Sequence, residues 1–464
     1  MAQPAHQIVA PSLKPPVFID VFSGCGGLSL GLMTAGLQGL FAVEKNSDAF
    51  LTLNHNLMGK KRDEYKFNWP SWLPVSNLTT SDLLEKYPKQ IESLKGKVDV
   101  LAGGPPCQGF SMAGRRDPND PRNILAEEYL KVVELIMPRV VLLENVQGFD
   151  MVFSDKKSPN KLIKNPMENK AYSAIIKEKL EAIGYKVFTT TLTCSDFGVP
   201  QRRKRFIMIS IRNNDSALTH LGNKDPFKLL QDMAFSFKQA RGLSLTKKTS
   251  VKAAISDLIT IDRPTIPATD SPIKGYKQLD YIQANKGKRL TGYQKLLRKN
   301  ADGAPNSLRL TKHKISTTNK FALIRSTCDL GKSISDADRK RLGIKKNSIT
   351  PLHPDLPSVT ITTLPDDIIH YSEPRILTVR ENARLQSFPD WFSFQGKYTT
   401  GGDRRTKECP RYTQVGNAVP PLFAEALGLL LKNLLSVKTS DPSASEANEN
   451  WEQEISLEND LALV

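Results

Sequence analysis

The strongest constraint on the fold is a mostly apolar segment that ends in a stiff turn carrying a cysteine. Residues 98–102 predict a buried strand, and Gly-Gly-Pro-Pro-Cys follows at residues 103–107. Two glycines let the backbone approach a ligand closely, and two prolines stiffen the turn. Such a turn presents Cys107 at the carboxyl end of a strand, where open α/β sheets bind their ligands. An isolated cysteine is more often buried and inert, so the rest of the chain has to decide.

Two further apolar segments end in residues that suit a cofactor. Residues 17–22 predict a short buried strand, followed by Ser-Gly-Cys-Gly-Gly at 23–27 and the start of a helix at 28–33. A strand, a glycine-rich turn and a helix make a nucleotide-type cradle, although the dinucleotide spacing GxGxxG is not met. Residues 40–43 predict the second strand, and Glu44 at its end is placed to accept hydrogen bonds from a ribose. Together these features favour a ribose-bearing cofactor.

Charged residues also border two later strands. Glu144 directly follows a predicted buried strand at 140–143, so we expect its carboxyl group in the same crevice as Cys107. Gln-Arg-Arg-Lys-Arg at 201–205 precedes a strand at 206–211 and offers cations to a phosphate or a polarised substrate. Taken alone, each feature is also typical of an ordinary solvated acid or a solvated basic cluster.

The composition indicates a polyanionic partner. The 464 residues carry a net charge of +17, which favours nucleic acid, although lysine-rich solvated surfaces are also common. Five cysteines without CxxC spacing indicate neither disulfides nor a zinc site, and a reducing, cytosolic setting fits best. No apolar run approaches the roughly 18–20 residues that span a membrane. The first residues contain no apolar signal core.

The order of predicted elements indicates one large domain and one small domain. The large domain is expected over 17–260 and again over 376–436, with helices at 124–137, 172–183 and 422–435 and a β-rich stretch at 184–193. From about residue 215 to residue 374 strand–helix alternation fades and lysine, proline and threonine dominate, and we expect a small, irregular, β-rich domain over residues 261–375. Residues 1–16 and the acidic segment 437–464 are expected to be disordered.

Two local patterns complete the reading of the chain. Asp82 is expected to cap a helix over 83–94 that Pro88 breaks or kinks. The polar segment 111–123 predicts a mobile loop whose arginines suit phosphates.

These stretches together resemble the DNA (cytosine-5)-methyltransferase family, of the type found in prokaryotic restriction–modification systems. The resemblance covers nearly all of residues 17–435. Its motifs, in the family's order, are Asp-Val-Phe-Ser-Gly-Cys-Gly-Gly at 20–27, Gly-Pro-Pro-Cys-Gln-Gly-Phe-Ser at 104–111, Glu-Asn-Val at 144–146, Gln-Arg-Arg-Lys-Arg at 201–205, Arg-Leu-Gln-Ser-Phe-Pro at 384–389 and Gly-Asn-Ala-Val-Pro at 416–420. Six motifs in order make a chance match negligible.

The resemblance implies an α/β fold with a Rossmann-like, S-adenosylmethionine-dependent methyltransferase domain. Its mixed seven-stranded sheet would carry helices on both faces, and a small β-rich target-recognition domain would lie across a cleft that holds double-stranded DNA. In the family the last motif returns to the large domain beside the first. The loop at 416–421 would therefore belong to the cofactor pocket.

The resemblance also implies catalytic roles. The target cytosine is flipped out of the duplex. The Cys107 thiolate adds to carbon 6, and Glu144, as a protonated acid, holds nitrogen 3. Arg203 would bind the carbonyl oxygen of the base and help to fix Glu144, with Arg205 in support. The methyl group would come from S-adenosylmethionine, which leaves as S-adenosyl-L-homocysteine, and no metal is expected.

Further site residues follow from the same motifs. The expected cofactor-binding residues are Phe22, Ser23, Gly24, Cys25, Gly26, Glu44, Asp82, Pro105, Asn417 and Val419, with Cys25 packing rather than reacting. The expected DNA contacts are Gln108, Ser111, Arg115, Arg116 and Arg122.

Three other functions compete with this one. A transfer-RNA methyltransferase on the same scaffold is disfavoured by the long basic region, which suits a DNA-recognition domain. A catalytically inactive DNA-binding protein is disfavoured by the intact Cys107, Glu144 and Arg203, and a cysteine hydrolase lacks a histidine within any motif.

We expect a monomer in the bacterial cytoplasm, associated with the nucleoid through DNA and with no membrane partner. The resemblance also allows for a cognate restriction endonuclease that acts on the same site.

Overall fold

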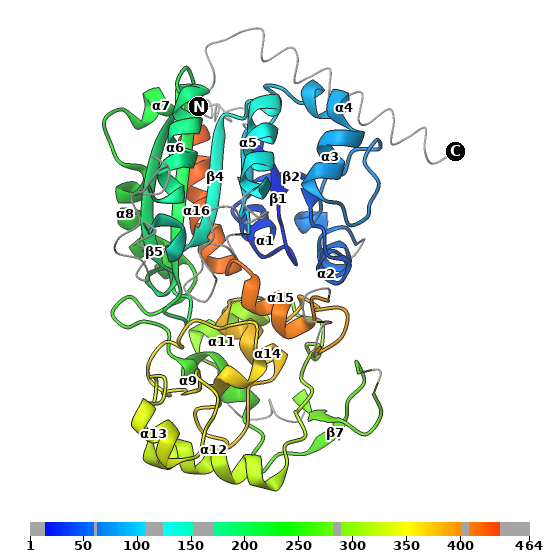
Figure 1. The fold of residues 1–464 in the computed structure, drawn as a ribbon, viewed down its shortest axis with the longest axis vertical. Helices are drawn as coiled ribbons and strands as arrows, with labels where there is room; N and C mark the ends of the chain where they lie inside the picture. The colour runs from blue at the N-terminus through cyan, green and yellow to red at the C-terminus, as the bar shows by residue number, and fades with distance from the viewer. Residues whose placement is uncertain are drawn as a thin grey trace, which may run out of the picture.

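The chain forms two lobes, with a sheet in the upper lobe of Figure 1 and a mainly helical, irregular lobe below it. The structure, a computed structural model, describes residues 14–59, 63–106, 124–151, 170–271, 273–281, 289–400, 404 and 408–436.

One mixed sheet organises the upper lobe. Its strand order is β2-β1-β3-β4-β6-β5, in which the first four strands are parallel and β6 runs antiparallel to both β4 and β5. The strands are β1 Val17–Val21, β2 Gln38–Val43, β3 Val100–Gly103, β4 Val140–Val146, β5 Tyr185–Thr193 and β6 Lys204–Arg212. The predicted mixed α/β sheet is confirmed. The described residues form six of its strands, each visible in the sequence, whereas the number seven came from the resemblance alone.

Helices cover both faces of this sheet because successive side chains of a strand point to opposite faces. Phe18 of β1 packs with one set of helices and Ile19 with the other, so the sheet separates two hydrophobic clusters. The first cluster includes residues from α1 Gly27–Thr34, α2 Ser47–Leu57, α7 Ser216–Leu221, α8 Pro226–Ala240 and α16 Pro421–Leu435. The second includes residues from α3 Thr80–Lys86, α4 Pro88–Ser93, α5 Ile124–Ile136 and α6 Tyr172–Ala182.

The first and last helices of the fold pack in direct contact. A Cβ atom at Gly31 of α1 would lie 2.3 Å from the Cβ of Ala424 in α16, so only glycine allows this approach. Among the described residues, the stretch Arg411–Leu435 has the length and apolar composition that could cross a membrane. Most of it is buried in the protein, which is the arrangement of a core helix.

In the part of the lower lobe that the structure describes, strands are few and short, so the expectation of a β-rich domain is wrong there. Its strands are two or three residues long and pair as two small ribbons, β7 Thr265–Pro267 with β8 Lys277–Leu279, and β9 Thr350–Pro351 with β10 Ile368–Ile369. The threonine-rich segments lack alternation, and several threonines and serines cap helices instead of forming strands. The described helices of the lobe include α9 Val251–Ile255, α11 Gly292–Arg298, α12 Ile315–Thr327 and α13 Asp336–Arg341, and α14 Val379–Leu385 lies among them (Figure 1).

A buried arginine network connects helices of the lower lobe (Figure 1). Arg384 of α14 Val379–Leu385 is fully buried and forms ion pairs with Asp257 (2.5 Å) and Asp390 (2.7 Å). It also donates to the carbonyl oxygen of Ala254 in α9. Because apolar residues of α9 and α14 belong to the same cluster as the first face of the sheet, the core continues from the sheet into the lower lobe. The division at residues 260 and 375 stays a prediction.

The remaining short elements connect these parts. A loop is expected at 414–421, but its first residues form the end of helix α15 Arg411–Asn417. Pro420 separates α15 from α16. The 3-10 helices are η1 Asp63–Tyr65, η3 Gln147–Asp150, η5 Cys194–Phe197, η6 Ser256–Leu258 and η7 Pro365–Asp367.

Candidate active site

The turn after β1 and the end of β2 meet as the sequence predicts. The backbone N–H of Gly24 donates to Glu44 Oε2 (2.9 Å), and the N–H of Asn46 donates to Oε1 (2.7 Å). Desolvation raises the pKa of the Glu44 carboxyl group above its usual value. Gly24 has a positive φ of 57°, and a Cβ there would meet no atom within 4 Å. The turn therefore leaves open space next to a carboxylate that backbone amides hold in place.

The last motif lies beside the first, as expected. A Cβ at Gly27 would come within 2.4 Å of the carbonyl oxygen of Val419. The buried Cys25 Sγ lies 3.7 Å from the carbonyl oxygen of Gln414 in α15. Burial raises the pKa of this thiol well above its usual range, which suits packing rather than reactivity. Asn417 is exposed at the end of α15.

Glu144 is held between two neighbouring strands. Arg205 of β6 lies opposite Val146 of β4, so Arg205 and Glu144 are diagonal neighbours on one face of the sheet. Arg205 Nε lies 2.7 Å from Glu144 Oε1, and both side chains are nearly buried. On the other side, a Cβ at Gly104 would lie 3.3 Å from Glu144 Oε2. The Glu144 carboxylate therefore stands where the Gly-Pro-Pro segment leaves β3.

Arg203 forms hydrogen bonds elsewhere than to Glu144 among the described residues, and its expected role towards Glu144 and the base stays a prediction. Its guanidinium group is buried and donates to the carbonyl oxygens of Ile361 (3.2 Å) and Gly416 (3.1 Å). Burial, with the nearby charge of Arg205, lowers the pKa of Arg203 to about 9. Arg203 precedes β6, so it leaves the sheet face that Arg205 occupies. It connects the lower lobe and α15 to the edge of the sheet.

Asn145 is a site residue whose role the sequence did not reveal. Its Nδ2 donates to the carbonyl oxygen of Pro105 (2.9 Å), and its Oδ1 accepts the N–H of Val146 (2.9 Å). Asn145 therefore anchors the backbone of the segment that leads to Cys107. The only signal in the sequence was its position next to Glu144 at the end of an apolar strand.

Asp82 is not the helix cap, and its carboxylate is bound by neighbouring residues of α3. Thr79 caps α3 by accepting the N–H of Asp82. The Asp82 carboxylate binds Lys86 (2.6 Å) and Thr79 (2.5 Å), which lower its pKa to about 2. Asn77 lies closer to the end of β2, because its Nδ2 donates to the carbonyl oxygen of Lys45 (3.0 Å). Asn77 is thus better placed than Asp82 to reach a ligand beside Glu44.

Several predicted residues cannot be placed. The nucleophile and the DNA-contact residues lie outside the described residues; these are Cys107, Gln108, Ser111, Arg115, Arg116 and Arg122.

Phe22 at the end of β1 has a positive φ of 64°, which is rare for a residue other than glycine, and Ser23 donates to the carbonyl oxygen of Val43 (3.3 Å).

Comparison with known proteins decides the family. The model of the C-5 cytosine-specific DNA methylase family matches residues 17–433. The chain belongs to this family. The resemblance seen in the six motifs is thereby confirmed.

The sequence similarity of this DNA methylase to two bacterial relatives covers most of the length of each protein. The chain is 32% identical to the type II methyltransferase M.DdeI of Desulfomicrobium norvegicum, over 88% of this chain and 86% of that protein. It is 31% identical to the type II methyltransferase M1.HphI of Haemophilus parahaemolyticus, over 88% and 85%. Among solved structures, a putative DNA modification methyltransferase encoded within an Escherichia coli prophage shares the fold. Its TM-score is 0.59 and its identity 23%, over 91% of this chain and 100% of that one.

Proposed function

We propose that this DNA methylase transfers a methyl group from S-adenosylmethionine to carbon 5 of a flipped-out cytosine in a specific duplex DNA sequence, through a covalent adduct of Cys107. The observation that carries the proposal is the Glu144 carboxylate, paired with Arg205 directly beside Gly104. An acid in this place can meet the edge of a pyrimidine whose carbon 6 is attacked from the next loop.

The crevice at the ends of β1 and β2 fits the proposed cofactor. Glu44 presents a carboxylate suited to ribose hydroxyls, and the backbone of Gly24 borders open space. We assign Phe22 to the adenine ring and Ser23 to Gly26 to the methionine end. Pro105, Asn417 and Val419 complete the proposed pocket, and Asn77 replaces Asp82. When bound, S-adenosylmethionine supplies an electrophilic methyl group.

The residues of the chain supply the remaining chemistry. The Cys107 thiolate forms a bond to carbon 6 of the cytosine, and the electron pair of the 5,6 double bond becomes available at carbon 5. Glu144, as a protonated acid, donates its proton to nitrogen 3 in a hydrogen bond, and Arg205 holds Glu144 and reaches the carbonyl oxygen of the base. After carbon 5 gains the methyl group, its proton passes to water, the double bond reforms and the thiolate leaves.

Arg203 and Asn145 act as positioning residues in this proposal. Asn145 fixes Pro105, and Arg203 fixes Gly416 at the end of α15, so each holds one border of the reaction site through the backbone. Gln201 supports the same junction, because its Nε2 donates to the carbonyl oxygen of Leu385 (3.2 Å) and its Oε1 accepts the N–H of Ile361 (3.0 Å).

The biological setting is proposed from the relatives. Two of them are named as bacterial type II methyltransferases, so we propose double-stranded DNA as the substrate and a cognate endonuclease for the same sequence as a functional partner. We also propose that the protein acts as a monomer in the bacterial cytoplasm, at the nucleoid.

The test is transfer of labelled methyl groups to unmethylated duplex DNA, with the product digested to nucleosides. We expect label in 5-methylcytosine, and we expect Cys107→Ser to lower turnover at least about a thousandfold while DNA binding persists. Cys328→Ser is the matched control, since Cys328 lies in the lower lobe, outside the proposed site. Labelling of transfer RNA equal to that of DNA would contradict the substrate. Wild-type turnover by Cys107→Ser would contradict the nucleophile.

A further inference from the structure

Gln414 of α15 joins helix α2 to segments that lie far along the chain. Its side chain is 2% exposed, and both of its polar atoms are hydrogen-bonded. Oε1 accepts the hydroxyl group of Thr52 in α2 (2.6 Å). Nε2 faces the backbone carbonyl oxygens of Asp48 (3.3 Å), Gln395 (3.1 Å) and Cys409 (2.9 Å). Figure 1 shows α15 next to α2, where the two lobes meet.

The turn of α2 that Gln414 holds is the turn that holds Glu44. Asn46 caps α2 by accepting the N–H groups of Asp48 (3.0 Å) and Ala49 (3.2 Å). The N–H of Asn46 donates in turn to Glu44 Oε1 (2.7 Å). The Asp48 carbonyl oxygen that accepts from Gln414 belongs to this same first turn. A shift of the turn would therefore move one of the backbone groups that bind the Glu44 carboxylate.

Gln414 also contacts the turn that binds the other oxygen of Glu44. The backbone carbonyl oxygen of Gln414 lies 3.7 Å from Cys25 Sγ. Cys25 follows Gly24, whose N–H donates to Glu44 Oε2 (2.9 Å). Both carboxylate oxygens of Glu44 are thus bound by segments that Gln414 contacts, one after β1 and one after β2.

We propose that Gln414 is a positioning residue for the cofactor, which holds Glu44 where its carboxylate meets the ribose hydroxyl groups. Its side chain is bonded to protein groups, so it acts through α2 and the turn at Gly24 and not through contact with the ligand. The inference rests on the proposed function, because it concerns the same cofactor crevice. Since the ribose does not react, loss of this positioning should weaken cofactor binding and leave the chemical step unchanged.

Calorimetric titration of the full chain with S-adenosyl-L-homocysteine tests this. Gln414→Met keeps the length of the side chain and removes its hydrogen bonds, so the dissociation constant should rise at least about tenfold. In the methyl-transfer assay the KM for S-adenosylmethionine should rise in step, whereas kcat at saturating cofactor should change less than about twofold. Gln294→Met is the matched control, since Gln294 of α11 is also buried and hydrogen-bonded but lies in the lower lobe. This control should change the dissociation constant less than about twofold.

A double variant shows whether Gln414 acts through Glu44. Glu44→Ala removes the carboxylate, so adding Gln414→Met to it should raise the dissociation constant further by less than about twofold. A residue that only supports the fold would cause the same loss with and without the carboxylate, and that result would overturn the proposal.

Thr52→Val is a milder change for the case in which a thermal melt shows that Gln414→Met does not fold. The Thr52 hydroxyl group donates to Gln414 and accepts the N–H of Gln395 (2.9 Å). Its loss should weaken S-adenosyl-L-homocysteine binding about threefold, and this loss should disappear when Glu44→Ala is added.

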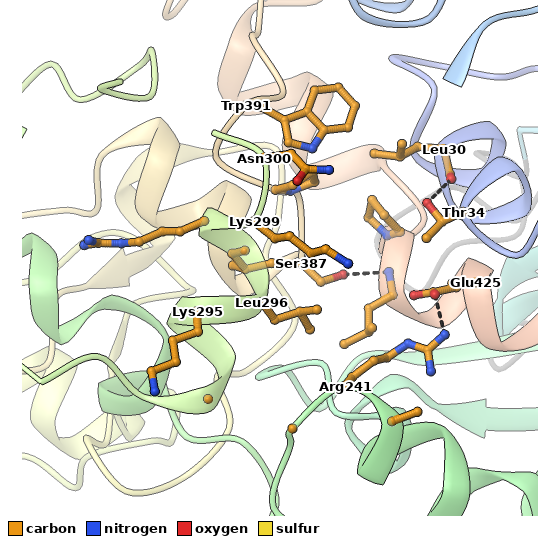
Figure 2. A pocket seen from close by; sticks show the side chains of 18 of the residues that line it. Leu30, Thr34, Arg241, Lys295, Leu296, Lys299, Asn300, Ser387, Trp391 and Glu425 are labelled. Carbon is orange, nitrogen blue, oxygen red and sulfur yellow. Dashed lines mark hydrogen bonds and ion pairs between the residues drawn. The ribbon is translucent and has the colours of Figure 1, made fainter. Parts of the chain in front are cut away.

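Thr34→Val is the control for Thr52→Val. The Thr34 hydroxyl group donates to the carbonyl oxygen of Leu30 (2.7 Å) within α1, as Figure 2 shows. Thr34 lines a cavity whose lining includes neither Glu44 nor Gln414, so this control should leave cofactor affinity unchanged.

The outcomes separate this proposal from the proposed function. A wild type that bound no S-adenosyl-L-homocysteine would contradict the cofactor assignment, and the positioning role with it. A wild type that bound it, together with Gln414→Met and Thr52→Val variants of equal affinity, would overturn the positioning role alone.

Discussion

Replacing Asp20 with asparagine should change how the stability of this protein depends on pH. Asp20 lies in β1 between Ala42 of β2 and Ala102 of β3, and its side chain is 1% exposed. Ser29 donates to its Oδ2, and Oδ1 has no hydrogen-bond partner in the described structure. Burial raises the pKa of Asp20 from an ordinary 3.8 to about 7. The residue is thus a neutral acid below neutral pH.

The size of the effect follows from the shift in pKa. Because the folded state binds this proton more tightly than the unfolded chain does, its contribution to stability is complete below about pH 4. It is lost as the pH rises towards 7. At 1.36 kcal/mol per unit of pKa, the full loss is about 4 kcal/mol. Between about pH 5 and pH 7 the wild type should lose about 2 kcal/mol relative to Asp20→Asn, which does not titrate.

Urea titrations of both proteins at several pH values from about 5 to about 8 measure this difference. The surrounding groups are Ser29 of α1, Glu44 and Tyr129 of α5, and none of them changes in the variant. Asp232→Asn on the exposed face of α8 is the control for loss of a surface carboxyl group. A constant difference between wild type and Asp20→Asn across this range would refute the assignment of a buried, protonated Asp20.

Two other predictions concern the reaction site. Arg205→Lys removes the Nε contact with Glu144, so methyl transfer in a single turnover should fall about tenfold or more, with little change in the free energy of unfolding. Arg203→Lys should instead lower the free energy of unfolding by about 2 kcal/mol, because two buried carbonyl groups lose donors. A loss of stability in Arg205→Lys together with slower methyl transfer in Arg203→Lys would contradict both roles. Asn145→Ala should lower kcat about fivefold and leave the KM for DNA unchanged, because it frees Pro105 and touches no phosphate; a higher KM alone would rule this out.

Local patterns were sufficient for the elements that carry the site. Each parallel strand of the main sheet is a short apolar segment that ends near a glycine or an acid, and parallel strands bring such ends to one edge. Glu44 and the turn at Gly24 therefore meet as expected. The long-range approach of Val419 to Gly27 was implied only by the family resemblance, because no pattern links segments nearly 400 residues apart.

Where side chains reach depends on partners that are distant in the chain. Arg203 and Arg205 stand two residues apart in one basic motif. Arg203 donates to the carbonyl oxygens of Ile361 and Gly416, which lie 158 and 213 residues away in the chain. Arg205 contacts Glu144 because the register of β4 and β6 makes the two residues diagonal neighbours. The lower lobe escaped prediction for a related reason. Its short ribbons and capped helices have too little periodicity to show in the sequence, and they are held by buried contacts such as those of Arg384. Periodicity and turn chemistry are local and can be read along the chain, but long polar side chains take their direction from whichever carbonyl or carboxylate the complete fold brings within reach.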